Sequence, residues 1–178
     1  MERVLALTQP PFKIDKTELC QISDIDLNNI DLHGNFIGND GLTALATACA
    51  SGALAQVTIL SLQCNAIGDE GVIALADACA NGALAQVTIL NLYGNQVGDA
   101  GLTALADACA KGALAQVTEL ALYDNSIGDA GLTALADACA KGALAQLRSL
   151  YIGNNPTSQQ SKDALKTALG KTQCDVDF

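Results

Sequence analysis

The sequence predicts a curved α/β solenoid in which parallel strands line the concave face and helices cover the convex face. Three observations lead to this fold class. The chain repeats with a period of 30 residues, which places Gly41, Gly71, Gly101 and Gly131 at equivalent positions. Each unit holds a short apolar alternation typical of a strand and a longer apolar stripe typical of a helix. A unit of this size buries its apolar face only against its neighbours, so about five units must stack.

Composition limits what the protein can bind. The 178 residues suit one domain, 50% of them are hydrophobic, only 3% are aromatic, and tryptophan is absent. A formal charge of -10 and a pI near 4.2 argue against nucleic acid or an anionic membrane as a ligand, because both would be repelled. The same charge favours a basic protein partner.

The first residues of the sequence do not match a signal peptide. The apolar run in MERVLALTQPPF is shorter than the roughly 7 to 15 residues of a signal-peptide core. No stretch approaches the ~20 apolar residues of a membrane span. We therefore expect an intracellular protein in the cytoplasm, with an organelle left open.

The strand half of each unit carries a fixed apolar spacing. In VTILSLQCNAIG, Leu60 and Leu62 alternate as a short strand does, and Asn65 follows in a turn. We expect this asparagine to pair backbone groups that the bending chain leaves unsatisfied. The five copies of the spacing are Leu27, Ile30, Leu32, Asn35 and Ile37; Val57, Leu60, Leu62, Asn65 and Ile67; Val87, Leu90, Leu92, Asn95 and Val97; Val117, Leu120, Leu122, Asn125 and Ile127; and Leu147, Leu150, Ile152 and Asn155.

The other half of each unit is predicted to be a helix. In the third unit the apolar stripe is formed by residues at i, i+3, i+4 and i+7, namely Leu102, Leu105, Ala106 and Cys109. We expect Asp99 to cap the start of this helix and Gly112 to end it in the left-handed conformation. The equivalent caps are Asn39, Asp69 and Asp129, and the equivalent stops are Gly52, Gly82 and Gly142.

The seven cysteines do not form a recognisable disulfide or zinc framework. No CxxC motif occurs, and the chain has one histidine. Four cysteines recur on the inward helical stripe, where a free thiol packs as a small apolar group: Cys49, Cys79, Cys109 and Cys139. The others are Cys20, Cys64 and Cys174.

The repeated unit resembles the leucine-rich repeat, in particular the longer ribonuclease-inhibitor-like subfamily. The resemblance rests on the L-x-x-L-x-L-x-x-N-x-L spacing and covers about residues 22 to 170. It implies a horseshoe-shaped scaffold that binds other proteins, and relatives that regulate a GTPase or an enzyme make such a role an alternative. The period of 30, rather than the usual 28 or 29, and the uniformity of the units depart from the family; recent duplication or consensus-style design would each produce such uniformity.

The curvature and the ends follow from packing. Parallel strands lie about 4.8 Å apart, whereas packed helices need roughly 8 to 10 Å, so the stack must curve with its strands inside. We expect residues 1–26 to form an N-terminal cap, residues 27–170 to form the solenoid, and residues 171–178 to form a C-terminal tail that frays.

The candidate binding site is the strand surface that faces away from the helices. Because side chains alternate along a strand, the residues between the buried leucines must line the concave face in three columns. The first column is Asn29, Ile59, Ile89, Glu119 and Ser149; the second is Asp31, Ser61, Asn91, Ala121 and Tyr151; the third is His33, Gln63, Tyr93, Tyr123 and Gly153.

The columns hold every tyrosine of the chain and its one histidine. Tyrosine is frequent among the energetic anchors of interfaces, and exposed isoleucines often accompany it. Tyrosine and isoleucine are also favoured on strands for their fit to a pleated surface, which is the alternative explanation. The expected partner-binding residues are Tyr93, Tyr123, Tyr151, Asn91, Glu119, Gln63, Ile59, Ile89, His33 and Asp31.

Catalysis and metal binding are poorly supported by the sequence. Asp31, His33 and Ser61 supply the residue types of a hydrolytic triad, but an i,i+2 pair on a strand is separated by roughly 6 to 7 Å and a shallow sheet offers no oxyanion donors. His33 with Cys64 gives only two metal ligands where three or four are needed. We therefore predict neither a catalytic residue, a metal nor a cofactor.

The predicted function is a protein-protein interaction module, monomeric alone, that binds a protein partner, basic by charge, through its concave face. It makes no direct membrane insertion and binds no nucleic acid. The alternative is a structural or linker subunit of a larger assembly, which would use the convex helices and the ends. Sequence alone leaves open which face makes the contact.

Overall fold

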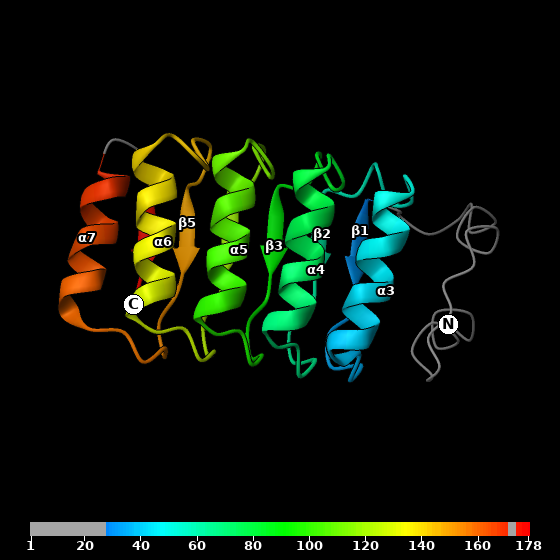
Figure 1. Ribbon diagram of the computed structural model, residues 1–178, viewed down its shortest axis with the longest axis horizontal. Helices are drawn as coiled ribbons and strands as arrows, with labels where there is room; N and C mark the ends of the chain where they lie inside the picture. The colour runs from blue at the N-terminus through cyan, green and yellow to red at the C-terminus, as the bar shows by residue number, and fades with distance from the viewer. Residues whose placement is uncertain (1–27, 171–173) are drawn as a thin grey trace.

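The structure is a computed structural model that describes residues 28–170 and 174–178. Figure 1 shows a row of helices in front of a row of strands, stacked along the long axis of the molecule. The elements are, in chain order, β1 (Asn29–Asp31), α3 (Gly38–Ala50), β2 (Ile59–Ser61), α4 (Asp69–Ala80), β3 (Ile89–Asn91), α5 (Asp99–Ala110), β4 (Glu119–Ala121), α6 (Asp129–Ala140), β5 (Ser149–Tyr151), α7 (Gln159–Leu169) and β6 (Asp175–Asp177).

The strands form one parallel sheet in which each strand pairs with the next along the chain. The sheet has six strands in the order β1-β2-β3-β4-β5-β6. The register follows the period of the sequence, so Leu60 lies opposite Leu90 and Leu90 lies opposite Leu120. This arrangement confirms the predicted curved α/β solenoid of 30-residue units. The predicted N-terminal cap, together with Cys20 and Leu27, lies outside the described residues.

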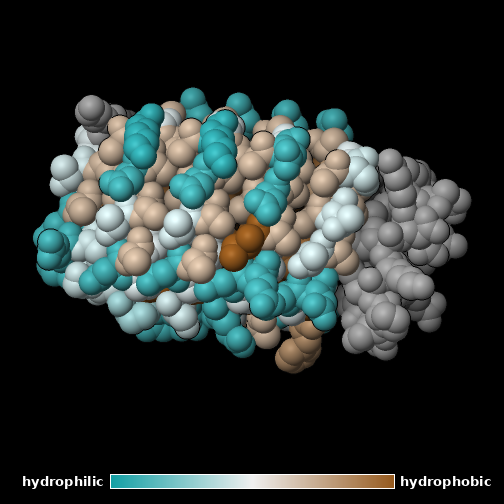
Figure 2. All heavy atoms as spheres, viewed as in Figure 1, coloured by the Kyte–Doolittle hydropathy of each residue, from teal (hydrophilic) through white to brown (hydrophobic). Residues whose placement is uncertain are grey.

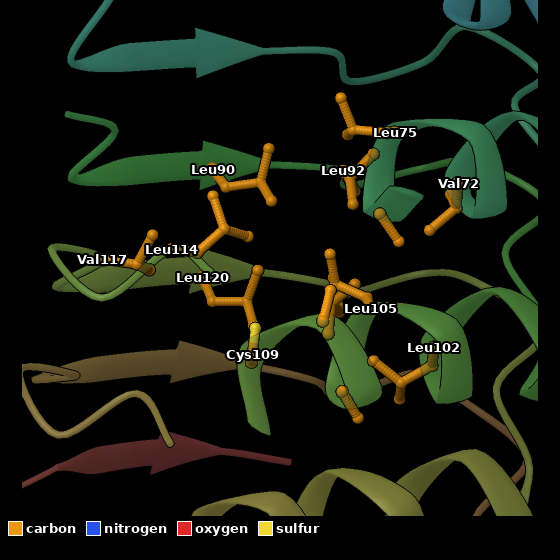
Figure 3. Packing of buried hydrophobic residues seen from close by; sticks show 14 of the residues in the cluster. Val72, Leu75, Leu90, Leu92, Leu102, Leu105, Cys109, Leu114, Val117 and Leu120 are labelled. Atoms are coloured by element: carbon orange, nitrogen blue, oxygen red, sulfur yellow. The ribbon is translucent and has the colours of Figure 1, made fainter. Parts of the chain in front are cut away.

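The core lies between the sheet and the helices. The strand leucines and the apolar stripes of the helices form one buried cluster, in which Leu60, Leu62 and Leu102 have no exposed surface. In Figure 3, Leu90 and Leu120 point from the strands toward Leu105 and Cys109 of α5. The predicted inward positions of strand and helix are therefore confirmed, and each unit buries its apolar residues against the next.

The four repeated cysteines pack in this core as predicted. Cys49, Cys79, Cys109 and Cys139 are buried and free. Burial raises the pKa of the Cys79 and Cys109 thiols to about 12, so both stay protonated at neutral pH. A buried neutral thiol behaves as a small hydrophobe, which suits the close spacing of the helices.

The turn asparagines join neighbouring units through the backbone. The side chain of Asn95 donates from Nδ2 to the carbonyls of Leu62, Leu92 and Tyr93 at 3.0, 3.0 and 3.2 Å. Its Oδ1 accepts from the backbone N–H groups of Asn65 and Ile67, both at 3.0 Å. The prediction that these asparagines satisfy the turn backbone is confirmed, with the addition that most of the bonds cross to the preceding unit.

The predicted helix caps need correction. α5 begins at Asp99, and no side chain caps its first turn from within the unit. The Oδ1 atom of Asp99 instead accepts from the N–H groups of Gly128 and Gly131, both at 2.8 Å, where α6 begins. Because Asp99 is itself the first helical residue, its side chain leaves the helix sideways toward the next unit. Each cap residue therefore serves the helix 30 residues further along.

The same sideways cap recurs along the stack. Asn39 accepts from the backbone N–H of Gly68 at 2.7 Å, and Asp69 accepts from that of Gly98 at 2.7 Å. The predicted helix stops are confirmed without change, because Gly52, Gly82, Gly112 and Gly142 adopt φ values of 90, 92, 96 and 93°.

Asp129 makes the last of these caps, and its ionisation should be visible in the stability of the protein. The backbone N–H of Ser158, followed by the hydroxyls of Ser161 and Ser158, lowers the pKa of Asp129 below its ordinary value. A lowered pKa in the folded state stabilises the protein above the unfolded pKa of about 4, and this contribution is lost as the pH falls through the folded pKa.

We therefore expect Asp129→Asn to make the melting temperature of the protein less dependent on pH below neutrality. The native protein should lose more melting temperature than the variant when the pH is lowered from neutrality to well below 4. Thermal unfolding of both proteins across this range, followed by circular dichroism, measures the difference. Parallel curves would mean that the Ser158 and Ser161 bonds do not stabilise the ionised carboxylate.

The chain ends in a strand, which was not expected. β6 pairs with β5 in parallel, with Val176 opposite Leu150, so the expected fraying of the tail is wrong for residues 174–178. The ring of Phe178 lies beneath the ammonium groups of Lys162 and Lys166, at 5.6 and 4.9 Å from its centroid. These contacts with α7 help to hold β6 on the sheet. The division of the chain into cap, solenoid and tail stays a prediction.

Candidate functional site

The concave face of the sheet carries the side chains that alternate with the buried leucines. On β2, Leu60 is fully buried while Ile59 and Ser61 remain partly exposed. The pairing register aligns such residues across strands, so Ile59, Ile89 and Glu119 follow one another in the first column. The three columns anticipated from the alternation are therefore present as rows of neighbouring side chains.

The three tyrosines are exposed aromatic side chains on this face. Tyr93, Tyr123 and Tyr151 expose 38, 38 and 39% of their surface. The rings of Tyr93 and Tyr123 are in contact, with centroids 5.7 Å apart and planes tilted by 34°. Tyr151 lies on the next strand, opposite Ala121 in the second column. The structure thus brings two tyrosines into contact and places the third on the adjacent strand.

Gly153 explains how the ring of Tyr123 is positioned. A Cβ atom added to Gly153 would lie 2.9 Å from Cε2 of Tyr123 and 2.7 Å from the carbonyl carbon of Phe178. The absence of a side chain therefore leaves room for both the ring and the end of β6. Sequence reasoning put Gly153 in the third column but gave no sign that its neighbours cover it.

The polar members of the columns mainly fix the local backbone. Oδ1 of Asp31 accepts from the N–H of His33 at 3.0 Å, and Oδ1 of Asn91 accepts from the N–H of Tyr93 at 3.0 Å. Oε1 of Gln63 is buried and has no hydrogen-bond partner among the described residues. Asn91 thus shapes the turn that carries Tyr93.

The triad arrangement of Asp31, His33 and Ser61 has no support in the contacts. Ser61 lies opposite Asp31 across β1 and β2, but the Asp31 carboxylate is engaged by the backbone N–H of His33. Within residues 28–170 and 174–178, no cluster of three or more His, Cys, Asp or Glu side chains could hold a metal ion.

The helix side has a different chemistry. Figure 2 shows this side covered largely by moderately hydrophobic residues and crossed by hydrophilic stripes. Hollows of 450 and 750 Å³ lie there, the first beside Cys79 and Lys111 and the second between α6 and α7. No helix in the described segments is both long and apolar enough to cross a bilayer.

β6 adds two functional candidates that sequence reasoning missed. Asp175 lies opposite Ser149 and Asp177 lies opposite Tyr151, so these carboxylates continue the first and second columns. Both are exposed, whereas Val176 packs against the core. The alternation of acidic and apolar residues in DVD was the available signal.

A strand, a turn with a buried asparagine and a helix, repeated in one parallel sheet, define the class of α/β solenoids. A family model described as "Leucine Rich repeat" matches residues 56–76, 86–106 and 116–136. These three matched segments are leucine-rich repeats, and the chain is therefore an α/β solenoid that contains such repeats.

Two solved structures are similar to this chain to different degrees. The actin-binding site 2 domain of leiomodin-1 superposes with a TM-score of 0.66 at 17% identity, covering 89% of each chain. An internalin from Listeria monocytogenes gives a TM-score of 0.48 at 23% identity, covering 77% of this chain and 31% of the internalin. The comparison with curated proteins gives no match. The likeness to the leiomodin-1 domain, at 17% identity, supports the fold alone.

Proposed function

We propose that the protein is a non-catalytic interaction module that binds a protein partner through its concave face. The observation that carries this proposal is the exposure of all three tyrosines of the chain on that face. Tyrosine contributes a large amphipathic contact area with few torsions to restrict, which makes it a frequent interface anchor. Leucine-rich-repeat domains are typically interaction modules, which is consistent with this function.

Sequence differences between the units also support the concave face as the binding surface. Residues 101–116 and 131–146 are identical, and they form most of two helices and the turns that follow. The strand segments that come next differ, as VTELALYDN and LRSLYIGNN. A scaffold requires uniform spacing between helices, whereas a binding surface requires particular side chains. The variation therefore supports recognition on the strand side.

The size of the face suits one ordinary interface. Six strands at a spacing of about 4.8 Å span roughly 25 Å, which accommodates a standard interface of about 800 Å² per partner.

The proposal also covers oligomeric state, location and subfamily. A monomer is expected in the absence of the partner. A location inside the cell is part of the proposal, because the six cysteines of the described segments are all free thiols. Assignment to the ribonuclease-inhibitor-like subfamily is also a proposal, supported by the full helix in each unit.

Actin is the first defined partner to test. The similar leiomodin-1 domain is an actin-binding site by its description, although likeness at 17% identity extends to the fold alone. The role of structural subunit in a larger assembly, or of regulator of a GTPase or an enzyme, is tested by the same experiment, because each predicts a different captured protein.

The test compares three folded proteins as bait in affinity capture from the source extract, followed by mass spectrometry. The first is the native chain and the second carries Tyr93→Ala, Tyr123→Ala and Tyr151→Ala. The third is a convex control with three exposed helix-side changes, Ile73→Ala, Lys111→Ala and Lys141→Ala. Any protein captured, and purified actin in parallel, is then titrated against all three baits.

We expect the tyrosine variant to weaken binding of the purified partner at least about 100-fold, as for the loss of several interface anchors. The convex control should bind within about threefold of the native chain, because surface truncations outside an interface have small effects. Equal binding by the tyrosine variant, with loss in the convex control, would place the interface on the helices and overturn the proposal.

A further inference from the structure

The charges around the tyrosines indicate what kind of partner this face recognises. β6 places Asp175 and Asp177 beside β5, with Asp177 directly opposite Tyr151. On the other side, Glu119 lies between Ile89 and Ser149 in the first column. Asp177 therefore lies beside Tyr151, whereas Glu119 and Asp175 lie in the first column, roughly 13 Å along the strand direction from Tyr93 and Tyr123 in the third. We call this set the acidic aromatic patch: Tyr93, Tyr123, Tyr151, Glu119, Asp175 and Asp177.

Basic residues are segregated to the other side of the molecule. In the described segments, the lysines lie on or at the ends of helices: Lys111, Lys141, Lys162 and Lys166. Lys162 and Lys166 are moreover engaged with the ring of Phe178. Arg148, just before β5, is the one basic side chain next to a described strand. Among residues 28–170 and 174–178, few cations thus balance the carboxylates of the patch, which favours a partner of opposite charge.

The patch presents hydrogen-bond acceptors next to aromatic rings. Tyr93 and Tyr123 pack against each other with a tilt of 34° and remain 38% exposed, so ring surface is open to a partner. The accessible acceptors are the exposed carboxylates of Asp175 and Asp177, whereas Oε1 of Gln63, beside Tyr93, is buried. A guanidinium group stacks on an aromatic ring and still donates in its plane to carboxylate and amide oxygens.

We propose that the acidic aromatic patch binds a basic segment of the partner protein, with some of its arginine side chains stacked on Tyr93 and Tyr123 and others paired with Glu119, Asp175 and Asp177. This inference rests on the proposed function, because it names the chemistry of the partner for the same face. Arginine is favoured over lysine, since a compact and strongly hydrated ammonium loses more on leaving water and cannot stack as a plane.

The tyrosines themselves provide the assay. The chain has three tyrosines and no tryptophan, so its intrinsic fluorescence comes from the proposed patch alone. The probe is a short peptide of alternating arginine and serine, blocked at both ends, titrated at low salt. Matched peptides carry lysine or glutamate in place of arginine. Binding is measured by tyrosine fluorescence and, independently, by calorimetry.

The variants separate the local patch from overall charge. The patch variant carries Glu119→Gln, Asp175→Asn and Asp177→Asn, and the matched control carries Asp77→Asn, Asp107→Asn and Asp137→Asn on the exposed helix side. Both remove three negative charges with side chains of nearly unchanged size. Circular dichroism checks that each remains folded, and the pairing of β6 is checked by hydrogen exchange of the Asp175 amide, which donates to the Arg148 carbonyl.

We expect the arginine peptide to change tyrosine fluorescence and to bind the patch variant at least about tenfold more weakly than the native chain, with less than about twofold loss for the control. The lysine peptide should bind at least about threefold more weakly than the arginine peptide, and the glutamate peptide should not bind. Equal loss in both variants, or equal binding of arginine and lysine, would overturn the inference.

Failure here can be told apart from failure of the proposed function. If the tyrosine variant loses its purified partner but the native chain does not bind the arginine peptide, the concave interface stands and the basic-segment inference is wrong. If the peptide binds as expected while the tyrosine variant keeps its partner, the patch recognises arginine and the proposed interface is wrong.

A further variant tests stacking separately from charge. A variant with Tyr93→Leu and Tyr123→Leu, which keeps the carboxylates, should lose the preference for the arginine peptide over the lysine peptide.

Discussion

Replacing Asn95 by alanine is expected to lower the free energy of unfolding by about 3–5 kcal/mol, because it removes the partner of several buried backbone groups at once. The asparagine accepts from two N–H groups and donates to three carbonyls, and its exposed fraction is 9%. Each buried group left unpaired costs about 1–3 kcal/mol. The three carbonyls each keep a second donor, from Asn65, Asn125 and the Cys64 N–H, so the cost falls mainly on the two N–H groups and stays below the sum for five groups.

Urea unfolding of the native chain and the variant, followed by circular dichroism, measures this loss. Asn81→Ala is the matched control, because the Asn81 side chain is exposed and donates to the carbonyl of Asp77 at a helix end. That control should change the free energy of unfolding by less than about 1 kcal/mol. Similar shifts for the two variants would mean that the turn asparagines are not structural cross-links between units.

The asparagines also show how far the sequence could predict this fold. Their recurrence every 30 residues, next to alternating leucines, was enough to predict a strand and a turn stabilised by a side chain. It could not show that Oδ1 of Asn95 serves the turn of the preceding unit, because that contact depends on the register between strands. The same limit applies to Asp99, whose cap crosses to the next helix.

The candidate site was predictable where it depends on alternation within one strand. Residues between the buried leucines had to face away from the helices, and this placed Tyr93, Tyr123 and Tyr151 on one face. β6 was not predicted, because a three-residue strand without its own repeat has almost no periodicity to detect. The acidic character of the patch therefore emerged only when Asp175 and Asp177 were found beside β5.

A second large loss of stability is expected at the glycines whose N–H groups donate to the cap side chain of the preceding unit. A Cβ atom added to Gly131 would lie 2.8 Å from Oδ1 of Asp99, 3.0 Å from its Cα atom and 3.3 Å from Cβ of Leu102. Two of these three atoms lie at or next to the backbone of α5 and cannot turn away. The variant must therefore separate α5 from α6 or displace the carboxylate from its two N–H donors.

We expect Gly131→Ala to destabilise the protein by about 2–3 kcal/mol, as overpacking of a close contact does. A loss of stability would indicate the close contact, because replacing glycine by alanine within a helix normally raises the free energy of unfolding by about 0.5–1 kcal/mol. Gly170→Ala is the control, since its added Cβ would meet only carbonyl oxygens, at 3.3 and 3.4 Å, and its effect should stay within about 0.5 kcal/mol of zero.

A double-mutant cycle with Asp99→Ala tests whether the cap and the glycine act together. Alone, Asp99→Ala should cost about 1–2 kcal/mol through loss of the cap at α6. The double variant should cost less than the sum, because Gly131→Ala already displaces the carboxylate that Asp99→Ala removes. The contact with the Cα atom of Asp99 persists in the double variant, so it should remain less stable than Asp99→Ala alone. Additive effects would mean that Asp99 does not cap the helix of the following unit.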